Sequence, residues 1–158
     1  KKYLALVLGH VSESSGSIDY PLATRPGTLR RRAVTEPESF PGVMKDALTE
    51  YVVLERLEGC DLLEVRPKTG RTHQIRIHLS AIGNPVLGDR LYGGRRMRHD
   101  GVPERQLLHA AEIRFTFKGV PRRFESPLPS DFAEFVRGID GSEKAGYPGE
   151  ALNRREGV

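Results

Sequence analysis

The sequence predicts a mixed α+β domain built mainly on an antiparallel sheet with a few helices. Two kinds of observation carry this prediction. Short runs rich in β-branched residues are separated by two-residue turns, a pattern typical of hairpins. Two other stretches have helical periodicity and either stop at a glycine or begin at a capping serine. A length of 158 residues is enough for one domain with a buried core.

The first predicted element is a strand at residues 3–8, which read YLALVL. Both alternating sets of side chains are apolar, so we expect both faces of this strand to be buried. The chain enters this strand almost at once and has no initiator Met, whereas native domains usually begin with a more polar approach. We therefore expect the sequence to begin partway through a protein, with a processed amino terminus as the alternative.

The segment from Ile18 to about Met44 has the composition of a long loop. It contains four prolines and two glycines, together with a basic cluster at Arg25, Arg30, Arg31 and Arg32. Long excursions of this kind are usually functional or mobile. The basic cluster makes this segment a candidate binding surface.

Regular elements resume after this segment. We expect a hairpin with its turn at Glu58-Gly59, a short helix that stops at Gly83, a strand that turns back at Lys118-Gly119, and a last helix capped by Ser130. These elements cover residues 49–59, 60–68, 72–83, 107–117, 122–128 and 131–139. Residues 1–140 then form the domain, and residues 141–158, which offer little to bury, form a flexible tail.

Composition restricts the functional classes. Lys and Arg total 25 against 21 acidic residues, a net charge of +4 that permits a nucleic-acid partner without requiring one. Cys60 is the single cysteine, so an internal disulfide is impossible and a structural zinc site is not expected. The sequence has no apolar run of the roughly 18 residues that a membrane span needs. We expect a cytoplasmic protein.

Arg76 stands at an unusual place on the predicted helix. At 100° per residue, the core-facing stripe contains Thr72, Ile75, Arg76, Leu79, Ile82 and Gly83, while Gln74, Ile77, His78 and Ala81 point elsewhere. Arg76 lies at the edge of that stripe, where its permanent charge needs a carboxylate, a phosphate or a set of carbonyls. A structural salt bridge, which is common, and a functional contact both remain open.

The five residues from Lys68 to Thr72 form a basic, glycine-containing turn before the helix. Such a turn directs backbone N–H groups and positive charge at an anion. The GK[ST] ending of a nucleotide-binding phosphate loop is absent, so the phosphate of a polynucleotide fits better than a nucleoside triphosphate. A solvated basic turn is the alternative. His73 and His78 are five residues apart and no carboxylate completes a metal set, so no metal site is expected.

Residues 66–94, RPKTGRTHQIRIHLSAIGNPVLGDRLYGG, are followed by LLHA at residues 107–110, and the chain opens with KKYLALVLG. In this order these segments resemble the RluA-type family of RNA pseudouridine synthases, over most of the chain from Lys2 to about Phe135. The resemblance implies part of a pseudouridine synthase catalytic domain. It also implies isomerisation of uridine to pseudouridine in ribosomal or transfer RNA, with neither a metal nor an organic cofactor.

The resemblance also implies roles for particular residues. Arg76 matches the partner of a catalytic Asp, and Tyr3 matches a tyrosine that stacks against the flipped base. Leu107 or Leu108 would supply the apolar wall of the pocket, and we favour Leu108. For Tyr3 and the leucines, plain core packing is the competing interpretation. RNA phosphates would be held by Lys68, Arg71, Thr72, His73, Gln74, Arg30, Arg31 and Arg32, with a second arginine-rich stretch at residues 90–105.

The chain departs from the family pattern at one important point. The motif H-R-L-D-x-x-T-S-G, which supplies the catalytic Asp in the family, does not occur in this sequence. Neither Asp61 nor Asp89 is a credible substitute, so we expect this chain alone to be inactive and Arg76 to lack its intended partner. A non-catalytic RNA-binding fragment or module and a structural remnant that binds nothing are the alternatives. We also expect an uncovered sheet edge that favours self-association.

Overall fold

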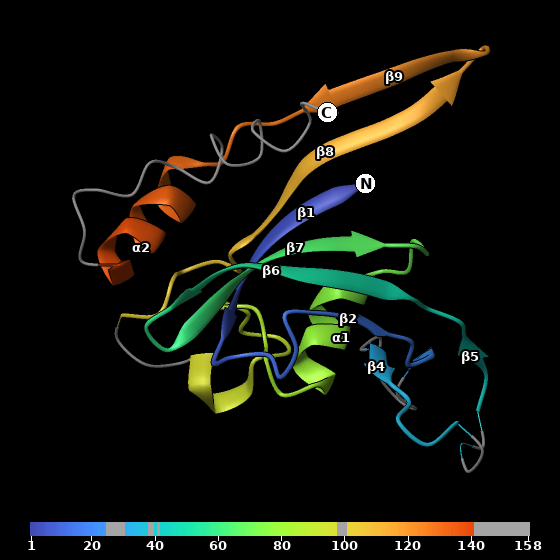
Figure 1. Cartoon of the computed structure of the whole chain (residues 1–158). Helices are drawn as coiled ribbons and strands as arrows, with labels where there is room; N and C mark the ends of the chain where they lie inside the picture. The colour runs from blue at the N-terminus through green and yellow to red at the C-terminus, as the bar shows by residue number, and fades with distance from the viewer. Residues whose placement is uncertain (25–30, 38–39, 41, 98–100, 141–158) are drawn as a thin grey trace.

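The computed structural model describes residues 1–24, 31–37, 40, 42–97 and 101–140. Their main feature is an antiparallel sheet of six strands, shown in Figure 1, which confirms the predicted α+β class. The strands lie in the spatial order β2 (Ser15–Ile18), β6 (Thr49–Leu57), β7 (Cys60–Pro67), β1 (Lys2–Leu8), β8 (Leu108–Phe117) and β9 (Val120–Glu125).

Strand β1 lies at the centre of the sheet and is buried on both faces, as its sequence predicts. Leu4 and Leu6 belong to one apolar cluster with Phe132 of helix α2 (Ser130–Asp140). The alternating residues Ala5 and Val7 belong to a second cluster on the opposite face. That cluster includes Ile75 and Leu79 of helix α1 (Gln74–Ala81), so each face of the sheet packs against one helix.

Both predicted hairpins are present. Gly59 closes the β6–β7 turn with a φ of 71°, and Lys118 and Gly119 close the β8–β9 turn with φ values of 49° and 76°. The β8–β9 turn has positive φ at both central residues, which characterises the tight turns that match the twist of the flanking strands, and glycine tolerates positive φ without steric cost. The final helix begins at Ser130, as predicted, and a 3₁₀ helix, η2 (Gly94–Met97), interrupts the loop between α1 and β8.

The prediction of an unstructured segment from Ile18 to Met44 is wrong in part. Three short strands, β3 (Leu22–Thr24), β4 (Arg31–Ala33) and β5 (Met44–Lys45), form a second antiparallel sheet in the order β4-β3-β5. Strands of two or three residues are too short to show an alternating pattern, and the prolines around them indicate a loop. Residues 25–30 and the predicted tail at 141–158 lie outside the described residues.

The second sheet changes which faces of α1 are buried. Ile77 packs against Leu22 of β3 and against Ala47, and His78 is completely buried. Gln74 is also buried, so the prediction that Gln74, Ile77 and His78 point away from the core is wrong. The helix lies between two sheets, whereas the predicted single core-facing stripe assumed that α1 packs against only one sheet.

No helix among the described residues is long and apolar enough to span a membrane.

Candidate functional site

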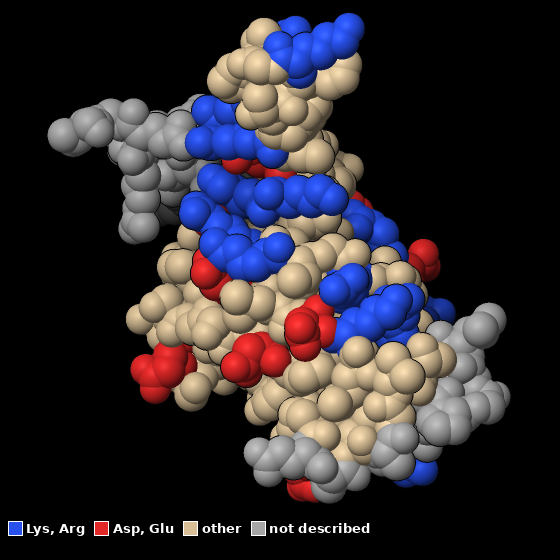
Figure 2. All heavy atoms as spheres, turned by 90° about the vertical axis from the view of Figure 1, so that its right-hand side faces the viewer, with Lys and Arg blue, Asp and Glu red and all other residues tan. Residues whose placement is uncertain are grey.

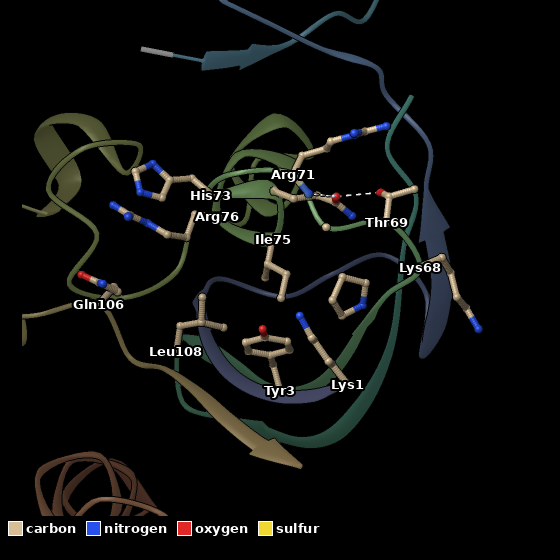
Figure 3. Close-up of a pocket in the computed structure, with 13 residues that line it drawn as sticks. Lys1, Tyr3, Lys68, Thr69, Arg71, His73, Ile75, Arg76, Gln106 and Leu108 are labelled. Carbon is tan, nitrogen blue, oxygen red and sulfur yellow. Dashed lines mark hydrogen bonds between the residues drawn. The ribbon is translucent and has the colours of Figure 1, made fainter. Parts of the chain in front are cut away.

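An open cavity of about 560 Å³ lies where β1 begins and β7 ends, beneath the start of α1. Several separate segments meet there: the amino end of the chain, the turn after β7, the first turn of α1 and the beginning of β8 (Figure 3). The predicted site residues that line the cavity are Tyr3, Lys68, Arg71, His73, Gln74, Arg76 and Leu108. Residues that are far apart in the sequence therefore share one site.

The apolar side of the cavity comes from Tyr3, Leu108 and Ile75. Strand register explains the first two, because Leu108 pairs with Ala5, two residues from Tyr3 and therefore on the same face of the sheet. Figure 3 shows the Tyr3 ring beside Leu108, with Ile75 across from them. Leu107 is 1% exposed and belongs to the cluster on the other face, so Leu108 is the leucine at the cavity. An aromatic ring with aliphatic neighbours suits the flat face of a base.

Arg76 forms a two-pronged ion pair with Asp89. Its Nε donates to Oδ2 at 2.7 Å, and its Nη2 donates to Oδ1 at 2.8 Å. Of the two interpretations left open for Arg76, the structure shows the structural salt bridge, and its partner is Asp89. The loop after α1 reverses direction and brings Asp89 back to the helix, an arrangement that the helical pattern alone does not contain.

Asp89 is fully buried, and its carboxylate accepts hydrogen bonds from the backbone as well as from Arg76. Oδ1 also accepts hydrogen bonds from the backbone N–H groups of Leu91 and Tyr92, each at 3.0 Å. Burial by itself would raise the pKa of Asp89, but the hydrogen bonds from Arg76 and from the backbone outweigh it, so the pKa is lowered. The hydrogen bond with Asp89 raises the pKa of Arg76. Both groups are charged at neutral pH.

Gln74 organises the basic turn. Its Oε1 accepts hydrogen bonds from Thr69 Oγ1 at 2.7 Å and from the backbone N–H of Arg71 at 3.0 Å. Its Nε2 donates to the Leu48 carbonyl at 2.9 Å and to Thr49 Oγ1 at 3.0 Å. Because Gln74 is 3% exposed and both ends of its amide bind protein groups, we correct its predicted role from RNA contact to support of the turn.

The basic side chains of the turn remain at the surface. Lys68 pairs with Glu50 at 2.9 Å, but both side chains are about half exposed, so solvent screens this pair. Arg71 is exposed and its Nε donates to the Asp46 carbonyl at 3.1 Å. A carbonyl partner does not neutralise the guanidinium, which keeps its charge for an anion. Thr72 is exposed beside the cavity and is not part of its lining.

His73 precedes α1 in a left-handed conformation, with a φ of 56° that a non-glycine residue seldom adopts. Its Nδ1 lies 3.0 Å from the Tyr92 hydroxyl, and the two rings meet edge to face. Burial lowers the pKa of His73, and the charges of Arg76 and Arg31 lower it further against the opposing effect of Asp89. The imidazole is therefore neutral at pH 7. A strained backbone at the edge of a cavity is typical of functional sites.

The predicted arginine cluster is only partly described. Arg30 lies outside the described residues, and Arg31 and Arg32 belong to β4 and do not line the cavity. Arg31 is close enough to affect the pKa of His73, whereas Arg32 lies over the Phe40 ring, 5.1 Å from its centroid. A short strand, and not a free loop, therefore presents these two cations next to the site.

Asp61 lies at the opposite end of the β1–β7 pair from the cavity. It is fully buried and accepts hydrogen bonds from His10 at 2.7 Å, from the Val11 N–H at 2.9 Å and from Arg56 at 3.3 Å. These contacts hold the turn after β1, and Asp61 does not contact Arg76. Among the described residues, no group of three or more His, Cys, Asp or Glu side chains could hold a metal ion.

Several residues that build or support the site were not predicted, among them Lys1, Gln106, Asp89 and Tyr92. Lys1 and Gln106 line the cavity, although they stand at the start of the chain and in a loop where no pattern marks them. Tyr92 contacts His73, and its ring lies 5.1 Å from the Arg76 guanidinium carbon. The segment GDRLYG, which contains Asp89 and Tyr92, could have indicated a partner for Arg76. It follows directly after the helix on which Arg76 lacks an evident counter-ion, and it contains a carboxylate.

Comparisons with known proteins point to one family. The family model described as RNA pseudouridylate synthase matches residues 1–81. The chain is 35% identical over 151 residues to ribosomal large subunit pseudouridine synthase D of Haemophilus ducreyi, covering 88% of this chain and 44% of that protein. It is 37% identical over 142 residues to the uncharacterized RNA pseudouridine synthase YlyB of Bacillus subtilis, covering 88% and 44%.

Solved structures show the same fold. Human RNA pseudouridylate synthase domain containing 1 superposes with a TM-score of 0.74 at 30% identity, covering 99% of this chain and 66% of that chain. Human RNA pseudouridylate synthase domain containing 4 has a TM-score of 0.65 at 23% identity, covering 87% and 62%, and shows likeness of fold. The chain spans about half the length of the two bacterial relatives from Haemophilus ducreyi and Bacillus subtilis, 44% in each case.

Proposed function

Because this chain belongs to the RNA pseudouridylate synthase family, we propose that it acts in the isomerisation of uridine to pseudouridine within structured RNA. In this reaction the N1–C1′ bond breaks, the base turns, C5 bonds to C1′, and C5 loses its proton while N1 gains one. The atoms balance without a cofactor. The relative from Haemophilus ducreyi is named for the large ribosomal subunit, which favours ribosomal RNA over transfer RNA as the target.

The observation that carries this proposal is the composition of the cavity. Its volume of about 560 Å³ lies within the usual range for small-ligand pockets. Tyr3 offers a ring on which a flipped pyrimidine stacks, and stacking places no demand on the orientation of the base within its plane. Leu108 and Ile75 add apolar walls that form no hydrogen bonds with the base edge. On the side of the cavity formed by Tyr3, Leu108 and Ile75, a base can therefore turn without breaking specific contacts.

Cations at the edge of the cavity suit the RNA backbone. Arg71 and Lys68 stand on the turn held by Gln74, and Arg31 and Arg32 stand on β4 near His73. Contacts to phosphates orient RNA without specifying its sequence. We therefore propose that the affinity for RNA falls steeply with salt and depends little on sequence.

We further propose that this chain alone binds RNA without turnover. Four donors hold Asp89, namely two nitrogens of Arg76 and two backbone N–H groups, so its carboxylate is not free to act on a ribose or a base. Asp61 is buried at the far end of the strand pair. Tritium release from RNA that carries C5-labelled uridine tests this directly. Turnover by the purified chain would contradict the proposed inactivity.

Two functions other than catalysis can be told apart from it by experiment. A non-catalytic RNA-binding module is favoured by the constrained Asp89, and a structural remnant would bind nothing. Filter binding to a structured RNA at 50 mM and 200 mM salt separates them. A salt-dependent affinity supports the RNA-binding proposals, and no retained RNA at either salt concentration would leave only the remnant.

Self-association through an open sheet edge is also part of this proposal. The pairing of β1 with β8 ends at Lys2 and Glu112, so residues 113–117 of β8 pair only with β9 among the described residues. A two-fold antiparallel pairing centred on Phe115 would place Arg114 opposite Thr116 of a second copy, with no like charges facing each other. A monomer by light scattering at all concentrations would contradict it.

We also propose a cytoplasmic location, since Cys60 is a free, buried thiol that fits a reducing compartment.

A further inference from the structure

The β8–β9 hairpin extends beyond the rest of the main sheet (Figure 1) and carries an exposed apolar face. Five large side chains, between 36% and 57% exposed, form what we call the hairpin face: Ile113, Phe115, Phe117, Val120 and Phe124. Soluble proteins seldom expose so many large apolar side chains together unless the surface binds something. Neither core packing nor the cavity accounts for them.

The hairpin face lies on the same side of the sheet as the cavity. Tyr3 pairs with Ala110, but Lys2 pairs with Glu112, so a bulge at Ala111 shifts the register. Glu112 consequently faces the side of Lys2 and α2, and the next residue, Ile113, faces the side of Tyr3 and α1. Alternation then brings Phe115 and Phe117 to the cavity side. The bulge turns an apolar row toward the side of the sheet on which the cavity lies.

One strand connects the two places. β8 contributes Leu108 to the cavity and Phe115 to the hairpin face, seven residues further along. At a rise of about 3.3 Å per residue, the Cα atoms of the two residues are at most about 23 Å apart. Stacked nucleotides advance about 3.4 Å each, so about seven of them span that distance. An RNA strand whose target base occupies the cavity therefore reaches the hairpin face.

Charge and ring geometry favour RNA as the occupant. Residues 112–125 contain four cations, Arg114, Lys118, Arg122 and Arg123, against two glutamates, a net charge of 4 − 2 = +2. Arg122 pairs with Phe115 in the strand register and so stands on the hairpin face itself. Figure 2 shows Lys and Arg gathered over the upper part of the molecule and Asp and Glu mostly below them.

The aromatic rings are placed for stacking. Phe115 and Phe124 lie nearly parallel, with an interplanar angle of 15° and centroids 5.9 Å apart, and they are 45% and 57% exposed. Arg114 and Arg123 on the opposite face bind Glu112, which fixes the two strands against each other. Parallel, exposed rings on a rigid ribbon with adjacent cations match the way that proteins hold unpaired nucleotides.

We propose that the hairpin face is a stacking platform for unpaired nucleotides that flank the target uridine. The inference rests on the proposed function, because it assumes that the cavity takes a nucleotide of the same RNA. It assigns to Phe115 and Phe124 the stacking contacts and to Arg122 and Lys118 the accompanying phosphate contacts. RNA affinity then depends on the length of the unpaired segment.

The test compares two double variants of the intact chain. F115L/F124L keeps the apolar surface but removes the aromatic faces, and F115Y/F124Y keeps the rings. Fluorescence anisotropy is measured with labelled uridine oligonucleotides of three and of twelve residues. We expect F115L/F124L to bind the twelve-residue RNA roughly tenfold more weakly than wild type, and F115Y/F124Y to bind within twofold. All three proteins should bind the three-residue RNA equally, and circular dichroism melts confirm that both variants fold.

The outcomes separate the two proposals. If F115L/F124L binds the twelve-residue RNA as wild type does while Arg71→Glu weakens it, the platform is refuted and the proposed RNA function stands. If wild type binds neither RNA, both fail. If F115L/F124L keeps its RNA affinity but loses a concentration-dependent dimer in light scattering, the hairpin face is a protein interface and the platform is again refuted.

Discussion

Replacing Asp89 by Asn tests whether the Arg76–Asp89 pair holds the site together. Asn can keep the three hydrogen bonds that Oδ1 accepts, from Arg76 Nη2 and from the N–H groups of Leu91 and Tyr92. Its amide nitrogen then replaces Oδ2, which accepts from Arg76 Nε at 2.7 Å, so that two donors face each other. The guanidinium also loses the only carboxylate it contacts among the described residues.

The expected loss of stability follows from burial. Removing one partner of a buried ion pair typically costs about 3–5 kcal/mol. The side chain of Asp89 is 0% exposed but that of Arg76 is 13% exposed, so we expect the lower end of this range, about 3 kcal/mol. With a urea dependence of about 2 kcal/mol/M, the unfolding midpoint falls by about 1.5 M. Urea titration followed by circular dichroism measures it.

Asp131→Asn is the matched control. Arg105 binds Asp131 with the same two-pronged geometry, at 2.6 and 2.7 Å, but the two side chains are 42% and 53% exposed. Solvent screens this pair, so the midpoint should move much less than with Asp89→Asn. Equal losses from the two substitutions would refute the reasoning that burial makes the Arg76–Asp89 pair important.

The pair also predicts a pH dependence. Because the folded state lowers the pKa of Asp89, the stabilisation is present above the unfolded value of about 3.9 and is lost as the pH falls toward the lower folded value. Below about pH 4, wild type should therefore lose stability more steeply than Asp89→Asn. Parallel curves for the two proteins would contradict this assignment.

Three further predictions concern the support of the site. Burial lowers the pKa of His78, whose Nε2 donates to the Tyr20 carbonyl at 2.8 Å. The free energy of unfolding should therefore fall as the pH drops below the unfolded pKa of about 6.5. In urea titrations, His78→Gln should remove this dependence on pH. Gln74→Leu should cost about 1–3 kcal/mol and weaken RNA binding, because two hydrogen bonds to the turn and two to Leu48 and Thr49 are lost; an unchanged unfolding midpoint would refute the role given to Gln74. Reversing the three arginines at 30–32 to Glu should weaken RNA binding and flatten its salt dependence in filter-binding assays, whereas unchanged affinity would remove that segment from the RNA surface.

Sequence patterns predicted the elements that local chemistry determines. The turns at Glu58-Gly59 and Lys118-Gly119 were identified because glycine allows the positive φ that such turns require. The central strand was identified because both of its faces are apolar. The second sheet was missed, since β3, β4 and β5 contain only two or three residues each and β5 pairs with β3 across about twenty residues of sequence. Missing that sheet led directly to the wrong buried face of α1.

The sequence predicted which residues lie at the site better than it predicted what each of them does. The basic turn, Tyr3 and Leu108 meet at one cavity as predicted. The turn follows β7, Tyr3 lies in β1 and Leu108 lies in β8, and the main sheet places these strands next to one another. Asp89 was not identified as the partner of Arg76, although it lies only thirteen residues further on, because the reversal of the chain after α1 depends on tertiary packing. Gln74 was assigned to RNA because its neighbours are basic, and burial gives it a different task.

The arginine on the helix illustrates how the site divides its tasks. A guanidinium at the edge of a core must be neutralised, and Asp89 does this inside the described part of the chain. The carboxylate that neutralises Arg76 is held by four donors, which is why we propose that it does not act on a nucleotide. Gln74 fixes the cationic turn in the same way, leaving Arg71 charged at the surface. In the described part of the chain, the buried side chains of Asp89 and Gln74 thus hold cationic groups that border the cavity, and under the proposed function the carboxylate that acts on a nucleotide is a different one from Asp89.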